Sequence, residues 1–206
     1  EEVKTDKRLF AQAFKRFYLE QNHIRGSRLI QDQGAWHVVN NKPSRPLSVS
    51  EMDIVYGLPY TRAWHPGYEE MGGVPALEEV RFSITSHRGC FGECSFCAIS
   101  SHQGRIIQRR SDESMVAEAK MFKTMSGFKG YIHDVGGPTA NFMSPSCKEQ
   151  LVRGACTGKS CLFPEPCKKL HADHTEYIEL LRKLRNIPGI KKVFIRSGLR
   201  YDYIIA

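Results

Sequence analysis

A pattern of strand, loop and helix that recurs three times from about residue 78 is the feature that most constrains the fold of this chain. The first strand is predicted by Val80, Phe82 and Ile84, which alternate at period two. Two further strands are predicted over residues 130–139 and 191–202. Because strands that alternate with helices form parallel β/α units, the pattern predicts an α/β protein.

Two helices are expected between these strands. Ser111 can cap the first, and its apolar stripe contains Met115 and Phe122. Asp173 followed by Glu176 is a capping-box pattern for the second. About three β/α units are too few to close a barrel, so we expect an incomplete one.

The N-terminal part of the chain has a different character. Residues 5–20 place phenylalanines at helical spacing between basic residues, which predicts an amphipathic helix. Residues 35–65 are rich in proline and read as loop with short elements. We therefore divide the chain into a helical and irregular extension, residues 1–75, and a β/α region, residues 76–206.

Three cysteines follow the first strand directly. Cys90, Cys94 and Cys97 form the pattern CxxxCxxC. Thiolates select zinc, copper(I) or iron–sulfur clusters, and a structural zinc site would need a fourth ligand such as His87 or His102. In a four-iron cluster, three thiolates would instead leave one iron open to a substrate or cofactor.

The residues around these cysteines resemble a known family. "GCFGECSFCAI" resembles the CxxxCxΦC signature of radical S-adenosylmethionine (SAM) enzymes, with Phe96 as the aromatic residue. The segments "HDVGGPTANFM" and "IKKVFIRSGLRYD" further resemble the YgiQ-like radical SAM proteins, an uncharacterised protein family. This resemblance spans roughly residues 55–206.

The resemblance implies a partial radical SAM β/α barrel and a function. Cys90, Cys94 and Cys97 would bind a [4Fe-4S] cluster whose open iron holds SAM. Reductive cleavage of SAM would give a 5′-deoxyadenosyl radical that abstracts hydrogen from an unknown substrate. The resemblance also implies an electron donor such as flavodoxin or ferredoxin, but it does not identify any catalytic residue. A fragment that lacks the later strands is expected to be inactive.

The resemblance also implies residues that contact SAM. Phe96 would lie beside the adenine, and Gly136 with Gly137 occupies the place of the family's GGE motif, although Pro138 replaces its glutamate. Three polar residues near the strand ends are expected as further contacts: Thr139, Ser197 and Arg200.

A second group of cysteines lies in an insertion, residues 144–172. Its members are Cys147, Cys156, Cys161 and Cys167. Four thiols are enough to close a metal site, either zinc or a second iron–sulfur cluster. His171 or His174 could replace one thiol, and thiols without metal or disulfides are the alternatives.

Composition and charge bear on the partners of the protein, on its disulfides and on its location in the cell. The net charge of +8 suits an RNA partner, so the alternative function is a cysteine-rich zinc or iron–sulfur module that docks on RNA. Seven cysteines are an odd number and cannot all pair as disulfides. The absence of a long apolar run predicts no membrane span and no signal peptide, hence a cytoplasmic protein. An unpaired sheet edge suggests a dimer.

Overall fold

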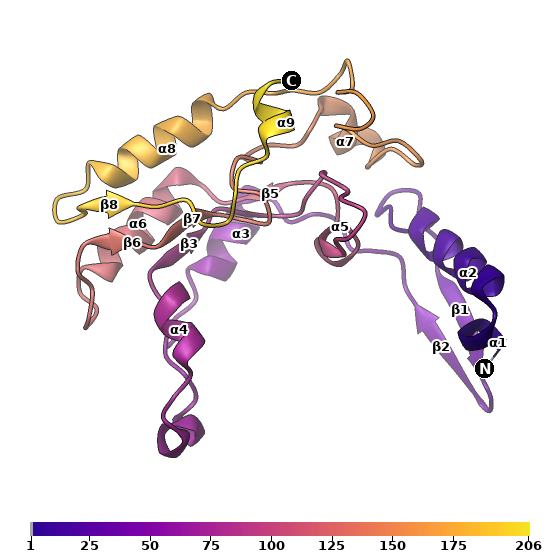
Figure 1. Cartoon of the computed structure of the whole chain (residues 1–206), viewed down its shortest axis with the longest axis horizontal. Coiled ribbons are helices and arrows are strands. Elements are labelled where there is room, and N and C mark those ends of the chain that lie inside the picture. Colours follow the sequence, from indigo (N-terminus) through magenta and orange to yellow (C-terminus); the bar gives the residue numbers. More distant parts are fainter. Residues whose placement is uncertain (1) are drawn as a thin grey trace. The chain divides into compact units, whose positions relative to one another are not determined.

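The computed structural model describes residues 2–206, and Figure 1 labels their helices and strands. These residues form two compact units: unit 1 contains residues 2–46, 90–106 and 145–171, and unit 2 contains residues 47–89, 107–144 and 172–206. Glu1, where the expected N-terminal extension begins, lies outside the described residues. The division of the chain at residue 75 stays a prediction.

Unit 1 consists of helices and a β-hairpin. Its elements are α1 (Glu2–Thr5), α2 (Lys7–Leu19), β1 (Leu29–Gln33), β2 (Trp36–Asn40), α5 (Ile99–Gln103) and α7 (Lys148–Arg153). The helix expected over residues 5–20 is confirmed as α2, since the Asp6 carboxylate caps it by accepting from the Arg8 and Leu9 amides. The antiparallel hairpin β1–β2 was not anticipated, because the sequence analysis expected one short strand followed by loop.

Unit 2 holds the parallel strands. Its elements are α3 (Val49–Tyr56), the 3₁₀-helix η1 (Pro66–Met71), α4 (Pro75–Val80), β3 (Ser83–Thr85), β4 (His87–Arg88), β5 (Gln108–Arg109), α6 (Asp112–Phe122), β6 (Tyr131–Ile132), β7 (Asp134–Gly136), α8 (Thr175–Arg185), β8 (Lys192–Val193) and α9 (Tyr201–Ile204). β3 pairs in parallel with β7, and β6 pairs in parallel with β8. The segment 131–136 thus pairs with both neighbours, and the mixed α/β class with parallel strands is confirmed. No closed barrel forms among the described residues.

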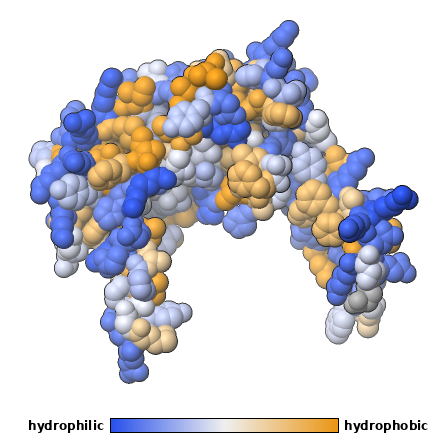
Figure 2. All heavy atoms as spheres, in the orientation of Figure 1, coloured by the Kyte–Doolittle hydropathy of each residue, from blue (hydrophilic) through white to orange (hydrophobic). Residues whose placement is uncertain are grey.

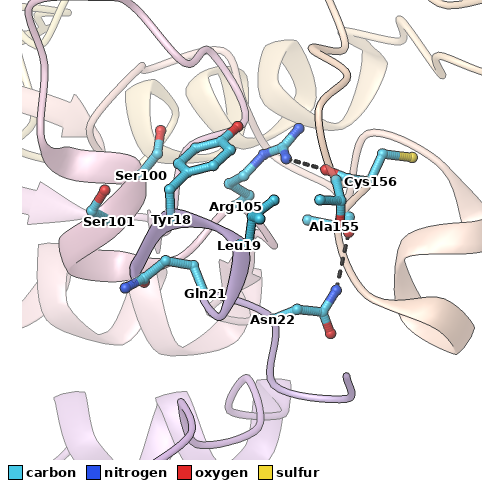
Figure 3. Close-up of a pocket in the computed structure, with 10 residues that line it drawn as sticks. Tyr18, Leu19, Gln21, Asn22, Ser100, Ser101, Arg105, Ala155 and Cys156 are labelled. Carbon is cyan, nitrogen blue, oxygen red and sulfur yellow. Dashed lines mark hydrogen bonds between the residues drawn. The ribbon is translucent and has the colours of Figure 1, made fainter. Parts of the chain in front are cut away.

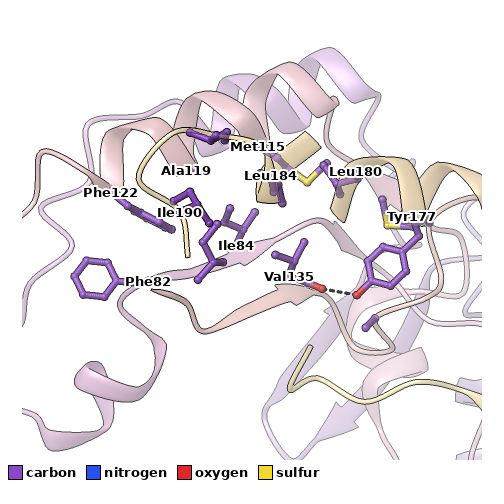
Figure 4. Packing of buried hydrophobic residues seen from close by; sticks show 14 residues of the cluster. Phe82, Ile84, Met115, Ala119, Phe122, Val135, Tyr177, Leu180, Leu184 and Ile190 are labelled. Carbon is purple, nitrogen blue, oxygen red and sulfur yellow. Dashed lines mark hydrogen bonds between the residues drawn. The ribbon is translucent and has the colours of Figure 1, made fainter. Parts of the chain in front are cut away.

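The hydrophobic core of unit 2 lies between these strands and two helices (Figure 4). Ile84 of β3 and Val135 of β7 are opposite one another and pack with Met115 of α6 and Leu180 of α8. The buried Tyr177 donates its hydroxyl to the Val135 carbonyl at 2.7 Å, which joins α8 to β7. The helices that the sequence predicted therefore cover the strands that it predicted.

Several element boundaries differ from the prediction. Val80 ends helix α4 and does not begin a strand, because Pro75 starts a helical turn that continues to the Arg81 amide. Ser111 caps α6 as expected. The predicted capping box of α8 was wrong: the N-cap residue is His174, and the Asp173 carboxylate accepts from the Thr175 amide at 2.8 Å.

Many apolar side chains reach the surface, as the space-filling view shows (Figure 2). Examples in unit 1 are Phe10 and Phe14 of α2 and Trp36 of β2. Within residues 2–206, no helix combines the length and the apolar character that a bilayer crossing requires.

Candidate functional site

The three-cysteine loop lies in unit 1, between the end of β4 and α5. The Cys90 amide donates to the Gly104 carbonyl at 3.0 Å, so the start of the loop lies beside the residue that follows α5. The Cys97 amide donates to the Cys94 carbonyl at 3.0 Å, which makes a tight turn of CxxC. The Gly92 amide donates to the Cys90 sulfur at 3.4 Å. Amide donors of this kind stabilise the charge on a cluster sulfur.

The three thiols differ in exposure. Cys90 is buried, whereas Cys97 is exposed and Phe96 beside it is 90% exposed. The seven cysteines form no disulfide within the described part of the chain. No three side chains of Cys, His, Asp or Glu in residues 2–206 lie close enough together to hold a metal ion. The loop brings the three cysteines near one another in the backbone but does not gather their sulfurs.

Glu93, inside this loop, is held by an ionic network that the sequence analysis missed. The Arg105 guanidinium pairs with Glu93 Oε2 at 2.6 Å, and the Tyr18 hydroxyl donates to Glu93 Oε1 at 2.8 Å. Glu93 has a positive φ of 47°, a conformation that L-residues rarely adopt. Two partners from different segments therefore fix a strained residue between Cys90 and Cys94.

Arg105 also reaches the cysteine-rich insertion (Figure 3). Its guanidinium donates to the carbonyls of Cys156 at 2.5 Å and Lys159 at 2.9 Å. Nearby, the Asn22 amide donates to the Ala155 carbonyl at 3.0 Å. Arg105, Asn22, Ala155 and Cys156 help to line a small hollow of about 30 Å³. One side chain therefore links the two cysteine groups.

Gly136 and Gly137 lie at the carboxyl end of β7, in unit 2. A Cβ on Gly137 would lie 2.6 Å from His87 Nε2, and one on Gly136 would lie 2.7 Å from Ser197 Oγ. The Gly136 carbonyl accepts from the Ser86 amide at 2.7 Å and so belongs to the sheet. The sequence analysis expected these glycines to admit a ligand. Their protein neighbours already require the absence of a side chain.

The polar residues expected near the strand ends come together in the same unit. The Ser197 hydroxyl donates to the Asp134 carboxylate, which also accepts from the Ser197 amide at 3.1 Å. The Arg200 guanidinium forms two hydrogen bonds to Asp202, at 2.8 and 2.6 Å. The Asn141 side chain binds the Arg200 backbone twice. Its amide oxygen accepts from the Arg200 amide at 2.9 Å, and its amide nitrogen donates to the Arg200 carbonyl at 3.2 Å. The Thr139 carbonyl accepts from the Phe142 amide at 3.1 Å.

His87 is fully buried beside these glycines. Its Nδ1 lies 2.8 Å from the Ser86 hydroxyl, while Nε2 is buried with no hydrogen-bond partner among the described residues. Burial lowers the pKa of His87 to about 4, although the Thr139 backbone partly opposes this. The imidazole is therefore neutral at pH 7. This burial was not predictable from the sequence, because a lone histidine after a strand is as typical of the surface as of the core.

Comparison with known proteins defines the class of protein first. The family described as Radical SAM N-terminal matches residues 1–83. That stretch precedes the cysteine loop and includes the extension in which the sequence analysis found no motif. The first 83 residues are therefore similar to the N-terminal part of radical SAM proteins.

Within this class, the chain is related over its whole length to the UPF0313 proteins. A UPF0313 protein of Clostridium botulinum (strain Okra / Type B1) is 58% identical over 205 residues, which are 100% of this chain and 32% of the relative. A UPF0313 protein of Clostridium perfringens (strain ATCC 13124) is also 58% identical over 205 residues, 100% of this chain and 31% of the relative. The expected family relationship is confirmed, and the chain spans about a third of the length of these relatives.

Proposed function

We propose that this chain contributes the cluster-binding part of a radical SAM enzyme. The observation that carries the proposal is the spacing of Cys90, Cys94 and Cys97, in a loop that follows the parallel strand β3 and the short antiparallel strand β4, in a chain with a Radical SAM N-terminal match. The donor set fits a [4Fe-4S] cluster, since three soft ligands lie within eight residues and one already accepts an amide hydrogen bond.

The bound cluster would supply reductive cleavage of SAM to a 5′-deoxyadenosyl radical. Cys90, Cys94 and Cys97 would hold it as thiolates. Glu93 and Arg105 would hold the loop in shape during turnover, because their ion pair connects it to α2 and the insertion. Cys97 is exposed and Cys94 is partly exposed, so these two thiols can be reached by iron and sulfide from solvent.

For SAM we propose contacts that match the family pattern. The Gly137 backbone and the side chains of Thr139 and Ser197, all in unit 2, would contact its polar groups, with the Ser197 hydroxyl as an acceptor because it already donates to the Asp134 carboxylate. Arg200 would contribute a cation only after exchanging Asp202 for the SAM carboxylate, because both oxygens of Asp202 now accept from it. Gly136 is not included, because its carbonyl accepts from the Ser86 amide as part of the sheet.

We further propose a reducing, cytoplasmic setting, with electrons from a carrier such as flavodoxin or ferredoxin. The thiols support this, since none is tied up in a disulfide within residues 2–206. The hydrogen donor is an unidentified substrate.

The test is anaerobic reconstitution of the protein with iron and sulfide, reduction in the presence of SAM, and measurement of 5′-deoxyadenosine. We expect release from the wild type, none from Cys94→Ala, and release from the matched control Ser95→Ala, which alters an exposed neighbour in the same loop. Equal release from wild type and Cys94→Ala would refute the proposal. Bound metal without any release would favour the alternative of a metal-binding module that docks on RNA.

A further inference from the structure

All four cysteines of the insertion line one cavity in unit 1. This cavity has a volume of about 450 Å³. Its thiols are Cys147, Cys156, Cys161 and Cys167, which are spread over twenty-one residues of sequence. Neither spacing nor helix periodicity requires them to line one hollow, so this shared lining is a structural finding. No three of these side chains lie within metal-binding distance of one another in residues 2–206, so a metal would have to draw the thiols together across the cavity.

The hollow has a polar and ordered wall. Cys161 and Ser146 are buried, and the Cys161 thiol donates to the Ser146 hydroxyl at 3.3 Å. Gln150, also buried, accepts from the Ser146 amide at 3.3 Å and places its own amide 4.0 Å from the Cys161 sulfur. The Cys167 amide donates to the Cys161 carbonyl at 2.9 Å. Two of the four cysteines are thereby tied to each other and to a fixed polar wall.

The charges around the hollow favour an anionic occupant. Four basic residues line it, Arg25, Arg153, Lys159 and Lys169, against the single acidic residue Glu149. Four thiolates around a divalent ion or a [4Fe-4S]²⁺ core carry a net charge of about −2, which basic neighbours stabilise.

We propose that Cys147, Cys156, Cys161 and Cys167 form a closed metal centre with four thiolate ligands, separate from the three-cysteine loop. The ligand chemistry is shared by one zinc ion and one cubane iron–sulfur cluster, because both take four thiolates. The histidines considered with the sequence are not part of it. His174 Nε2 lies 3.1 Å from the Asn141 amide in unit 2, and His171 does not line the cavity.

The centre would give the insertion the order that its few apolar residues do not supply. Ordering matters beyond the insertion, because the carbonyls of Cys156 and Lys159 hold Arg105, and Arg105 holds Glu93 in the three-cysteine loop. A metal at the second group would therefore steady the first group without taking part in its chemistry.

The experiment starts from the protein carrying Cys90→Ala, Cys94→Ala and Cys97→Ala, purified without oxygen. Iron, acid-labile sulfide and zinc are measured per chain. We expect either about one zinc, or about four irons with matching sulfide. Adding Cys167→Ser should reduce the metal to the level of a variant without cysteines, whereas Lys168→Ala, an exposed neighbour, should leave it unchanged.

Metal in the triple variant no higher than in the cysteine-free variant would overturn the proposal. A second measurement does not depend on the folding of any variant. In the wild type, alkylation read by mass spectrometry should spare the four insertion cysteines until a chelator is added, and modification that is equal with and without chelator would also overturn it. The triple variant lacks the loop cysteines, so the metal content measured in it does not depend on the proposed radical chemistry.

Discussion

Arg105 and Glu93 lie 2.6 Å apart as an ion pair that joins the segment after the cysteine loop to a residue inside it. Both side chains are nearly buried, and Glu93 has the left-handed backbone conformation. Tyr18 of α2 shares the carboxylate. The pair thus couples three stretches of sequence within unit 1.

Arg105→Ala should destabilise unit 1. The change removes the ion pair and the bonds to the Cys156 and Lys159 carbonyls, so the free energy of unfolding should fall by about 2 kcal/mol or more. Urea unfolding measures this. Arg153→Ala is the control, because Arg153 is 78% exposed and its pair with Glu149 at 3.5 Å should contribute less than about 0.5 kcal/mol. Equal losses in the two variants would contradict the role given to Arg105.

Glu118→Gln should destabilise unit 2 more strongly. Glu118 accepts from the fully buried Arg110 at 2.5 Å and from Arg62 at 2.8 Å. Neutralising it leaves the Arg110 charge buried without a counter-ion, at a cost of about 3–5 kcal/mol. Thermal unfolding should show a large fall, and the control Glu79→Gln, which breaks an exposed pair with Arg196, should show almost none.

His87 should make folding sensitive to acid. Its pKa is about 4 in the folded chain and 6.5 in the unfolded chain, so below pH 6.5 the unfolded state binds more protons. The stability from the neutral imidazole is complete above pH 6.5 and is lost as the pH falls from 6.5 to 4, by about 1.4 kcal/mol per pKa unit. His87→Gln should flatten this slope in urea titrations. An imidazole that titrates near pH 6.5 by NMR would refute the prediction.

Gly137→Ala should perturb the turn after β7. The new methyl group would lie 2.6 Å from His87 Nε2 and 2.7 Å from the His87 carbonyl, and backbone cannot move aside as a flexible side chain can. A loss of about 1–3 kcal/mol is expected in thermal unfolding. Gly67→Ala meets only the His65 ring, at 3.2 Å, and should change stability by less than about 1 kcal/mol. Similar melting temperatures for both variants would argue against the close packing.

The sequence predicted those parts of the fold that depend on local pattern. The positions of Met115 and Phe122 correctly predicted the buried face of α6, and Ser111 correctly predicted where the helix begins. Both predictions depend on periodicity and capping, which act within a few residues. Val80 was misassigned, since period-two alternation over few residues does not distinguish a strand from the end of a helix.

The chemistry of the site was only partly predictable. Spacing identified the cysteines, but the ionic partners of Glu93, the convergence of the insertion thiols and the burial of His87 depend on contacts between distant residues. Arg200 was expected at a ligand, yet its guanidinium is bound to Asp202 two residues away. Residue spacing alone did not indicate that the Arg200 guanidinium would bind the Asp202 carboxylate in place of a ligand.

The stretches of sequence that form unit 1 alternate with those that form unit 2, so unit 1 cannot be completed early during synthesis. Unit 1 is assembled from three separate stretches, and contacts such as Asn22 to Ala155 span 133 positions. When the three-cysteine loop leaves the ribosome, the carbonyl groups that will hold Arg105 have not yet been translated. The nascent loop must therefore wait about fifty residues, its thiols still accessible to oxidants and stray metal ions, before its anchor exists. Contacts this distant in sequence slow folding, and we expect unit 1 to complete its fold only after residue 171 has emerged.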